Sequence, residues 1–144
     1  MLFRSALYYL LSLFRFVIGE WYLATLLTLV FVAVAGGLGI YFWARTLLPS
    51  SQAMWVGLFY ALAPYHLNQL YQATMLAEWA GAAVLPFVFA FLERVCAHGR
   101  RRDVAGLAGC YALLVLTHLP LTVIGSLALV VYALVRVEIG RAHV

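Results

Sequence analysis

The run of residues from Trp21 to Trp43 contains almost only apolar side chains, and Glu20 and Arg45 bound it. A helix of this length rises about 1.5 Å per residue and therefore crosses a hydrocarbon core about 30 Å thick. The chain as a whole is 67% hydrophobic and 10% charged, whereas soluble domains have about 45–50% apolar and about 25% charged residues. We therefore predict an all-α fold, a polytopic transmembrane helical bundle.

Polar or proline-containing breaks divide the rest of the chain. Pro49-Ser50-Ser51 is expected to supply a helix N-cap, and Pro64 to stop or kink the helix that follows. Residues 104–137 would form a single helix about 50 Å long, too long for the bilayer, so we place a tight turn at residues 117–120. We expect about five to six membrane helices: 6–18 (partial), 21–43, 51–64, 79–95, 104–117 and 120–136.

The arginines test this arrangement, because cytoplasmic loops of membrane proteins carry an excess of positive charge. With these spans, Arg45, Arg94, Arg100 to Arg102 and Arg136 all fall on one side. We therefore expect a multi-pass protein of the bacterial plasma (inner) membrane. Residues 64–78 and 117–120 would lie outside, and residues 97–103 would lie in the cytoplasm.

The two ends of the chain resemble translated sequencing adapter. Residues 138–144 read Glu-Ile-Gly-Arg-Ala-His-Val, which a common short-read adapter encodes, and Leu2 to Ser5 resembles a translation of its opposite strand. We expect residues 1–5 and 138–144 to be adapter-derived. Residues 6–137 would then be a transmembrane fragment of a larger protein.

The stretch from Tyr60 to Gly81 is unusually polar for this chain and has no lysine or arginine. Leu67, Leu70, Tyr71 and Met75 recur there at helical spacing, opposite His66, Gln69 and Gln72. This pattern is typical of a short amphipathic helix in the outer membrane interface, with His66 in water. The same residues could instead line a site.

Two further residues leave the same choice open. Glu78 can be a first-turn residue favoured by the helix dipole, or a functional carboxylate, because ionisable groups near a membrane span are costly. His118 lies at the bend between two predicted spans. Glu93 and Arg94 are interpreted as an ordinary pair at the inner boundary. The candidate substrate-binding residues are Glu78, His66, Tyr71 and His118.

A family resemblance rests on particular motifs. These are Tyr-Ala-Leu-x-Pro-Tyr at 60–65, Leu-Tyr at 70–71, Leu-Ala-Glu at 76–78, Leu-Pro at 85–86 and Thr-His at 117–118. With them the chain resembles bacterial multipass membrane proteins called 6-pyruvoyl-tetrahydropterin synthase-related. Those proteins are similar in turn to GT-C-type glycosyltransferases.

The resemblance implies a substrate class, a sugar carried on polyprenyl phosphate and transferred at the outer face. It also implies that the catalytic carboxylate lies in an outer loop upstream of this segment. Family members often carry an arginine where Ala73 stands. The soluble pterin synthase needs a set of zinc-binding histidines, which His66, His98 and His118 cannot supply from two sides of a membrane.

Other functions remain open alternatives: a transporter or flippase-like protein, which would need ionisable residues near mid-membrane, or a membrane scaffold without chemistry. The sequence contains no nucleotide-binding loop, nucleophile elbow or metal motif. We expect no metal and no cofactor. The expected partners are membrane lipid and a polyprenyl-phosphate sugar. Nucleic acid is not expected, because the arginines lie singly or beside apolar runs.

Overall fold

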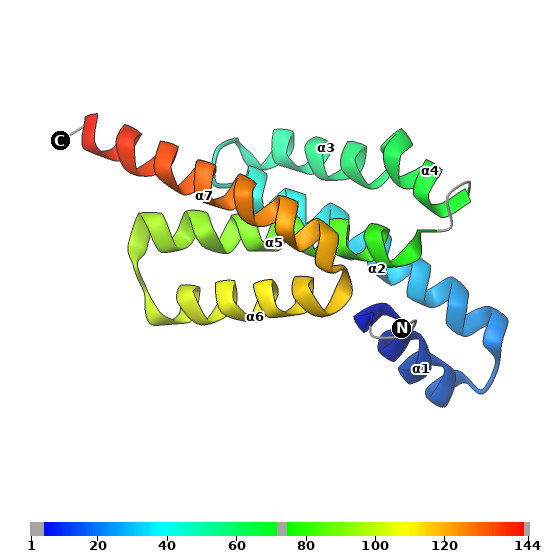
Figure 1. Ribbon diagram of the computed structural model, residues 1–144. Coiled ribbons are helices and arrows are strands. Elements are labelled where there is room, and N and C mark those ends of the chain that lie inside the picture. Colours follow the sequence, from blue (N-terminus) through cyan, green and yellow to red (C-terminus); the bar gives the residue numbers. More distant parts are fainter. Residues whose placement is uncertain (1–4, 72–74, 143–144) are drawn as a thin grey trace.

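The computed structural model describes residues 5–71 and 75–142, and within them the chain is helical (Figure 1). Turns separate the helices, and the left-handed Gly19 and Gly99 end two of them. The bounds are α1 Ala6–Ile18, α2 Trp21–Ala44, α3 Ser50–Ala61, α4 Pro64–Tyr71, α5 Leu76–His98, α6 Arg101–Thr117 and α7 Leu119–Ala142. The predicted all-α bundle is confirmed.

Helix α5 is the centre of the bundle. It packs against α2, α6 and α7 along its length, and against α1 and α4 near its start. Small residues and Trp79 fill the contact between α5 and α2, together with Val32. Val88, Leu114 and Leu129 form a second cluster between α5, α6 and α7. The outer faces of α2, α3 and α7 expose large apolar side chains, as expected of surfaces that meet lipid.

Three helices in the described part of the chain are long and apolar enough to cross a membrane: Trp21–Ala44, Leu76–His98 and Leu119–Glu138. Helix α3 has 12 residues and α6 has 17, so both are shorter. Helix α6 also begins at Arg101, earlier than the predicted residue 104. The expected count of five to six spans therefore stays a prediction.

Two sequence expectations concern the ends of helices. Pro49 occupies the N-cap of α3, within the stretch expected to supply it, and makes no side-chain cap hydrogen bond. Proline has no side-chain acceptor, and its fixed φ suits a helix start. Helix α7 runs on to Ala142, into the segment expected to be adapter-derived. Residues 1–4 and 143–144 lie outside the described residues.

Helix α4 continues in the direction of α3, and the other successive helices alternate, so most connections gather at two ends of the bundle (Figure 1). The α2–α3 and α5–α6 connections and the late turns of α7 form one end, the arginine end, with Arg45, Arg94, Arg100 to Arg102 and Arg136. The α4–α5 and α6–α7 connections form the other, the His118 end. The candidate residues His66, Tyr71, Glu78 and His118 all belong to the His118 end.

Candidate functional site

Glu78 is the centre of a group of polar side chains at the His118 end. Its Oε1 accepts a hydrogen bond of 2.6 Å from the hydroxyl of Tyr65 and one of 3.1 Å from Nε2 of Gln69. Tyr65 and Gln69 lie four residues apart on α4 and so share a helix face. The first turn of α5 presents Glu78 to that face. We call Tyr65, His66, Gln69 and Glu78 the polar cluster.

His66 lies inside the protein, with 6% of its surface exposed. Its ring stands edge-on to those of Tyr60 and Tyr65, with centroids 4.5 and 5.4 Å away. Burial lowers the pKa of the imidazole, which favours the neutral form. The expectation that His66 is solvated is therefore wrong.

Helix α4 is amphipathic as predicted, but its polar face is turned inward. His66 and Gln69 are buried, whereas Leu67 is exposed and Tyr71 is 77% exposed. This orientation suits a helix whose outer surroundings include lipid, because the apolar side chains then meet an apolar medium. Tyr71 consequently takes no part in the polar cluster. Gln72 and Ala73 lie outside the described residues.

Gln69 has a fixed amide orientation. Only its NH₂ group can donate to a carboxylate, so the bond to Glu78 places Oε1 on the other side of the amide. This Oε1 and Nδ1 of His66 are both buried, and neither has a hydrogen-bond partner among the residues that the structure describes. The cavity beside His66, lined by Val32 and Trp79 among others, measures about 10 Å³, about one water molecule. A larger ligand would reach the cluster at Tyr65, which is 45% exposed.

His118 joins α6 to α7. Its backbone N–H donates to the carbonyl of Leu114, and its Nδ1 accepts a hydrogen bond of 3.2 Å from the backbone N–H of Leu121. Because Nδ1 is an acceptor, the neutral ring carries its proton on Nε2 and can donate there. The Cβ of His118 lies 3.1 Å from the position a Cβ on Gly81 would take.

Gly81 follows Glu78 by three residues on α5, so His118 lies one helical turn from the polar cluster. The structure thus brings Glu78 and His66 together through Tyr65 and places His118 beside the same helix. Within the described residues, no hydrogen bond joins His118 to Glu78.

A buried network at the arginine end was missed from the sequence. Glu93 is 4% exposed and accepts hydrogen bonds from Arg136, through Nε at 2.9 Å and through Nη2, and from the hydroxyl of Tyr132 at 2.8 Å. Nε1 of Trp43 donates to the Tyr132 hydroxyl at 3.4 Å. The interpretation of Glu93 as a boundary partner of Arg94 is wrong. The network joins α2, α5 and α7.

The spacing of Tyr132 and Arg136, four residues apart, was the available signal for one polar stripe on α7. Sequence alone does not show which helix that stripe faces. Glu93 lies 43 residues before Arg136.

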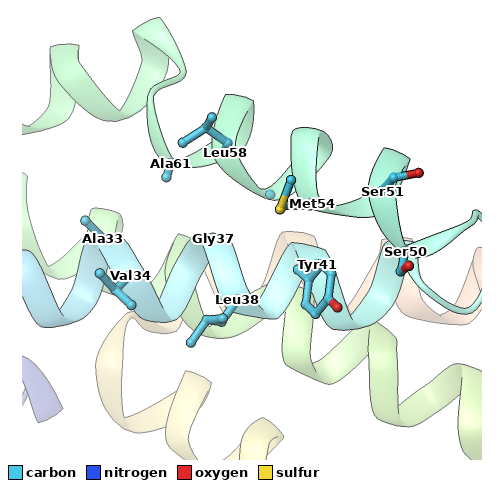
Figure 2. A pocket seen from close by; sticks show the side chains of 11 residues that line it. Ala33, Val34, Gly37, Leu38, Tyr41, Ser50, Ser51, Met54, Leu58 and Ala61 are labelled. Atoms are coloured by element: carbon cyan, nitrogen blue, oxygen red, sulfur yellow. The ribbon is translucent and has the colours of Figure 1, made fainter.

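A groove of about 610 Å³ runs between α2 and α3. Figure 2 shows Val34, Leu38 and Tyr41 along α2, and Met54 and Leu58 along α3. Because its lining is almost wholly apolar, we do not regard this groove as the polar site. It lies where the helices diverge from the close contact of Gly37 with Gly57.

A comparison with known proteins adds to this description of the apolar helices. A family model described as "6-pyruvoyl-tetrahydropterin synthase related domain; membrane protein" matches residues 3–144. The search of curated proteins and the search of solved structures each gave no match. The family match and the three apolar helices agree with a membrane location. The chain belongs to the 6-pyruvoyl-tetrahydropterin synthase-related family of membrane proteins.

Proposed function

We propose that this chain is part of a bacterial plasma-membrane enzyme similar to GT-C-type glycosyltransferases, with the His118 end outside. In this proposal the polar cluster binds the sugar of a polyprenyl-phosphate sugar. One observation carries it: a carboxylate, an amide and a buried imidazole meet beside two tyrosine rings at one end of an apolar bundle. Planar polar groups and aromatic rings together suit sugars, which have hydroxyl groups and apolar faces.

The polar cluster offers acceptors. Glu78 is a carboxylate, and Oε1 of Gln69 is a carbonyl oxygen without a donor. A ligand that donates hydrogen bonds, as sugar hydroxyls do, complements them. The cluster has no cation for the phosphate, so we assign that group to Nε2–H of His118, one turn along α5.

The transfer itself is expected to be inverting. A carboxylate takes the proton of the acceptor hydroxyl, and the oxygen of that hydroxyl attacks the anomeric carbon. The bond from the anomeric carbon to the phosphate oxygen breaks. The phosphate leaves with the bonding electrons. We assign Glu78 to sugar binding and do not assign the general-base step to it. The transporter alternative gains no support, because the charged side chains of the three long helices lie near their ends in the described residues.

Glu78→Gln tests the assignment by separating sugar from phosphate. The full chain in nanodiscs would be titrated with polyprenyl-phosphate hexose and with polyprenyl phosphate. We expect Glu78→Gln to weaken binding of the sugar-bearing lipid about tenfold or more, since a hydrogen bond to a charged group contributes about 1.5–3 kcal/mol. Binding of polyprenyl phosphate should be unchanged. His118→Ala should weaken both.

The matched control is Tyr22→Phe, which removes a hydroxyl from an exposed tyrosine near the start of α2. Tyr65→Phe should act like Glu78→Gln, but more weakly, and Tyr22→Phe should have no effect. Equal affinity of wild type and Glu78→Gln for the sugar-bearing lipid would contradict the proposal.

A further inference from the structure

A second cavity lies at the arginine end, away from the polar cluster. It measures about 510 Å³, and Arg94 and His98 of α5 line it together with Arg100, Arg102 and Asp103. Three guanidinium groups therefore face one carboxylate, which leaves a surplus of positive charge. The ion pair found within the described residues joins Arg136 to Glu93, and it involves none of the cavity arginines. The arginines of the cavity are thus available to an anion.

Phe91 of α5 also lines this cavity. Phe91 packs so closely on α6 that a Cβ added to Gly106 would lie 2.3 Å from its ring. The guanidinium of Arg94 stands over the same ring, 5.5 Å from the centroid. An arginine held on an aromatic face keeps its N–H groups for planar or tetrahedral anions, and phosphate is a favoured partner.

An apolar cavity of about 380 Å³ lies nearer the other end of α5, where residues of α1, α2, α5 and α6 line it. Phe87 of α5 and Leu113 of α6 line it. Phe87, Phe91, Arg94 and His98 recur at helical spacing and share one face of α5. At about 1.5 Å per residue, Phe87 lies about 10 Å from Arg94 along the helix. This face of α5 thus carries charged side chains at its end and aromatic side chains toward membrane depth.

From this arrangement we infer that the arginine end binds an anionic phospholipid, with its phosphate between Arg94, Arg100 and Arg102. The acyl chains extend from the head-group level into the surrounding bilayer, because Phe91 and Gly106 close the contact between α5 and α6. A soluble anion would need the arginines alone, whereas a phospholipid also needs their position at the membrane surface. The 23-residue helix Leu76–His98 ends at this cavity, so the arginines lie at the level of lipid head groups. The inference is independent of the sugar site.

The experiment compares phosphatidylglycerol with phosphatidylcholine of the same acyl chains. Native mass spectrometry of the full chain in a neutral detergent would count the bound lipids and give their affinities. We expect one phosphatidylglycerol to bind in preference to phosphatidylcholine. Arg94→Gln with Arg102→Gln should weaken it roughly 10- to 30-fold, from the usual contribution of an arginine near anionic lipid.

Arg45→Gln with Arg101→Gln is the matched control, because it removes the same charge at the same end but outside the cavity. It should change the affinity by less than about threefold, because neither side chain lines the cavity, so neither is placed to donate to the phosphate. Circular dichroism would check that each variant keeps its helices. If the first pair unfolds, Arg94→Gln alone against Arg101→Gln gives the same comparison, with an expected loss of about fivefold.

Three results would overturn the inference. Wild-type protein without a preference for phosphatidylglycerol would remove the site. Equal losses in the two arginine pairs would reduce it to general surface charge. Displacement of phosphatidylglycerol by inorganic phosphate at concentrations comparable to those of the lipid would show a site for soluble anions. Failure of the sugar-binding test would leave all three results unaffected.

Discussion

The side chains of α4 show how one buried residue can decide what a short helix does. A neutral imidazole and an amide are turned toward α5, although burying polar groups without partners costs free energy. The bond from Tyr65 to Glu78 offsets part of this cost. Burial and this bond raise the pKa of the Tyr65 hydroxyl to about 12, so it stays a donor throughout the neutral range. His66 lies beside this bond, and burial lowers the pKa of its imidazole.

Acidification should therefore loosen α4. The pKa of His66 is lowered in the folded state, so its contribution to α4 packing is present above the unfolded value of about 6.5 and is lost as the pH falls below it. Hydrogen exchange of the α4 amides, corrected for intrinsic rates, should accelerate between pH 7 and 5 by at most about tenfold per pH unit. His66→Gln, which cannot titrate, should lose this dependence. The same acceleration in His66→Gln would exclude His66 as its cause.

At the scale of the helices, close packing depends on small residues. Gly36 and Gly39 of α2 meet α5, and Gly37 meets Gly57 of α3. Glycines within an apolar run favour close helix approach, and the structure has such approach at these positions. Close approach stabilises helix contacts in lipid through van der Waals packing. The hydrophobic effect contributes little there, because lipid tails are as apolar as the side chains. The sequence did not predict which neighbour each glycine meets, because the pattern marks a face and not its partner.

Gly57→Ala should separate α3 from α2. A Cβ there would lie 2.7 Å from the carbonyl oxygen of Gly37, a backbone atom that cannot turn away. We expect a loss of about 1–3 kcal/mol, seen as a lower midpoint of thermal unfolding in detergent. Gly109→Ala is the control, because it lies within α6 with nothing within 4 Å. It should be neutral or stabilising by up to about 1 kcal/mol. Equal effects of the two substitutions would contradict this account of the contact.

For the whole molecule, hydropathy and helix breakers were sufficient to predict the all-α bundle and its order. The predicted 6–18 and 21–43 segments match α1 and α2 to within a residue, because apolar runs between polar ends define them. Glu93 escaped prediction, since its partner Arg136 lies two helices later. His66 was expected in water but is buried, because an amphipathic pattern shows two faces of a helix and not which face meets lipid. Glu78 and His118 lie at the same end of the bundle, and the expectation that this end is outside stays a prediction.

Labelling of single cysteines tests the arrangement of this bundle in the membrane. The arginine end should face the cytoplasm, because Arg45, Arg94, Arg100 to Arg102 and Arg136 gather there. With Cys96 and Cys110 replaced by alanine, a cysteine at position 68 or 119 should react with an impermeant maleimide added outside intact cells. A cysteine at position 100 should react only after the cells are opened. Asn68 is exposed, whereas its neighbour Gln69 is buried and would label poorly for that reason alone. Labelling at position 100 but not at 68 or 119 in intact cells would show the opposite orientation. The polar cluster would then face the cytoplasm, which would contradict sugar transfer at the outer face.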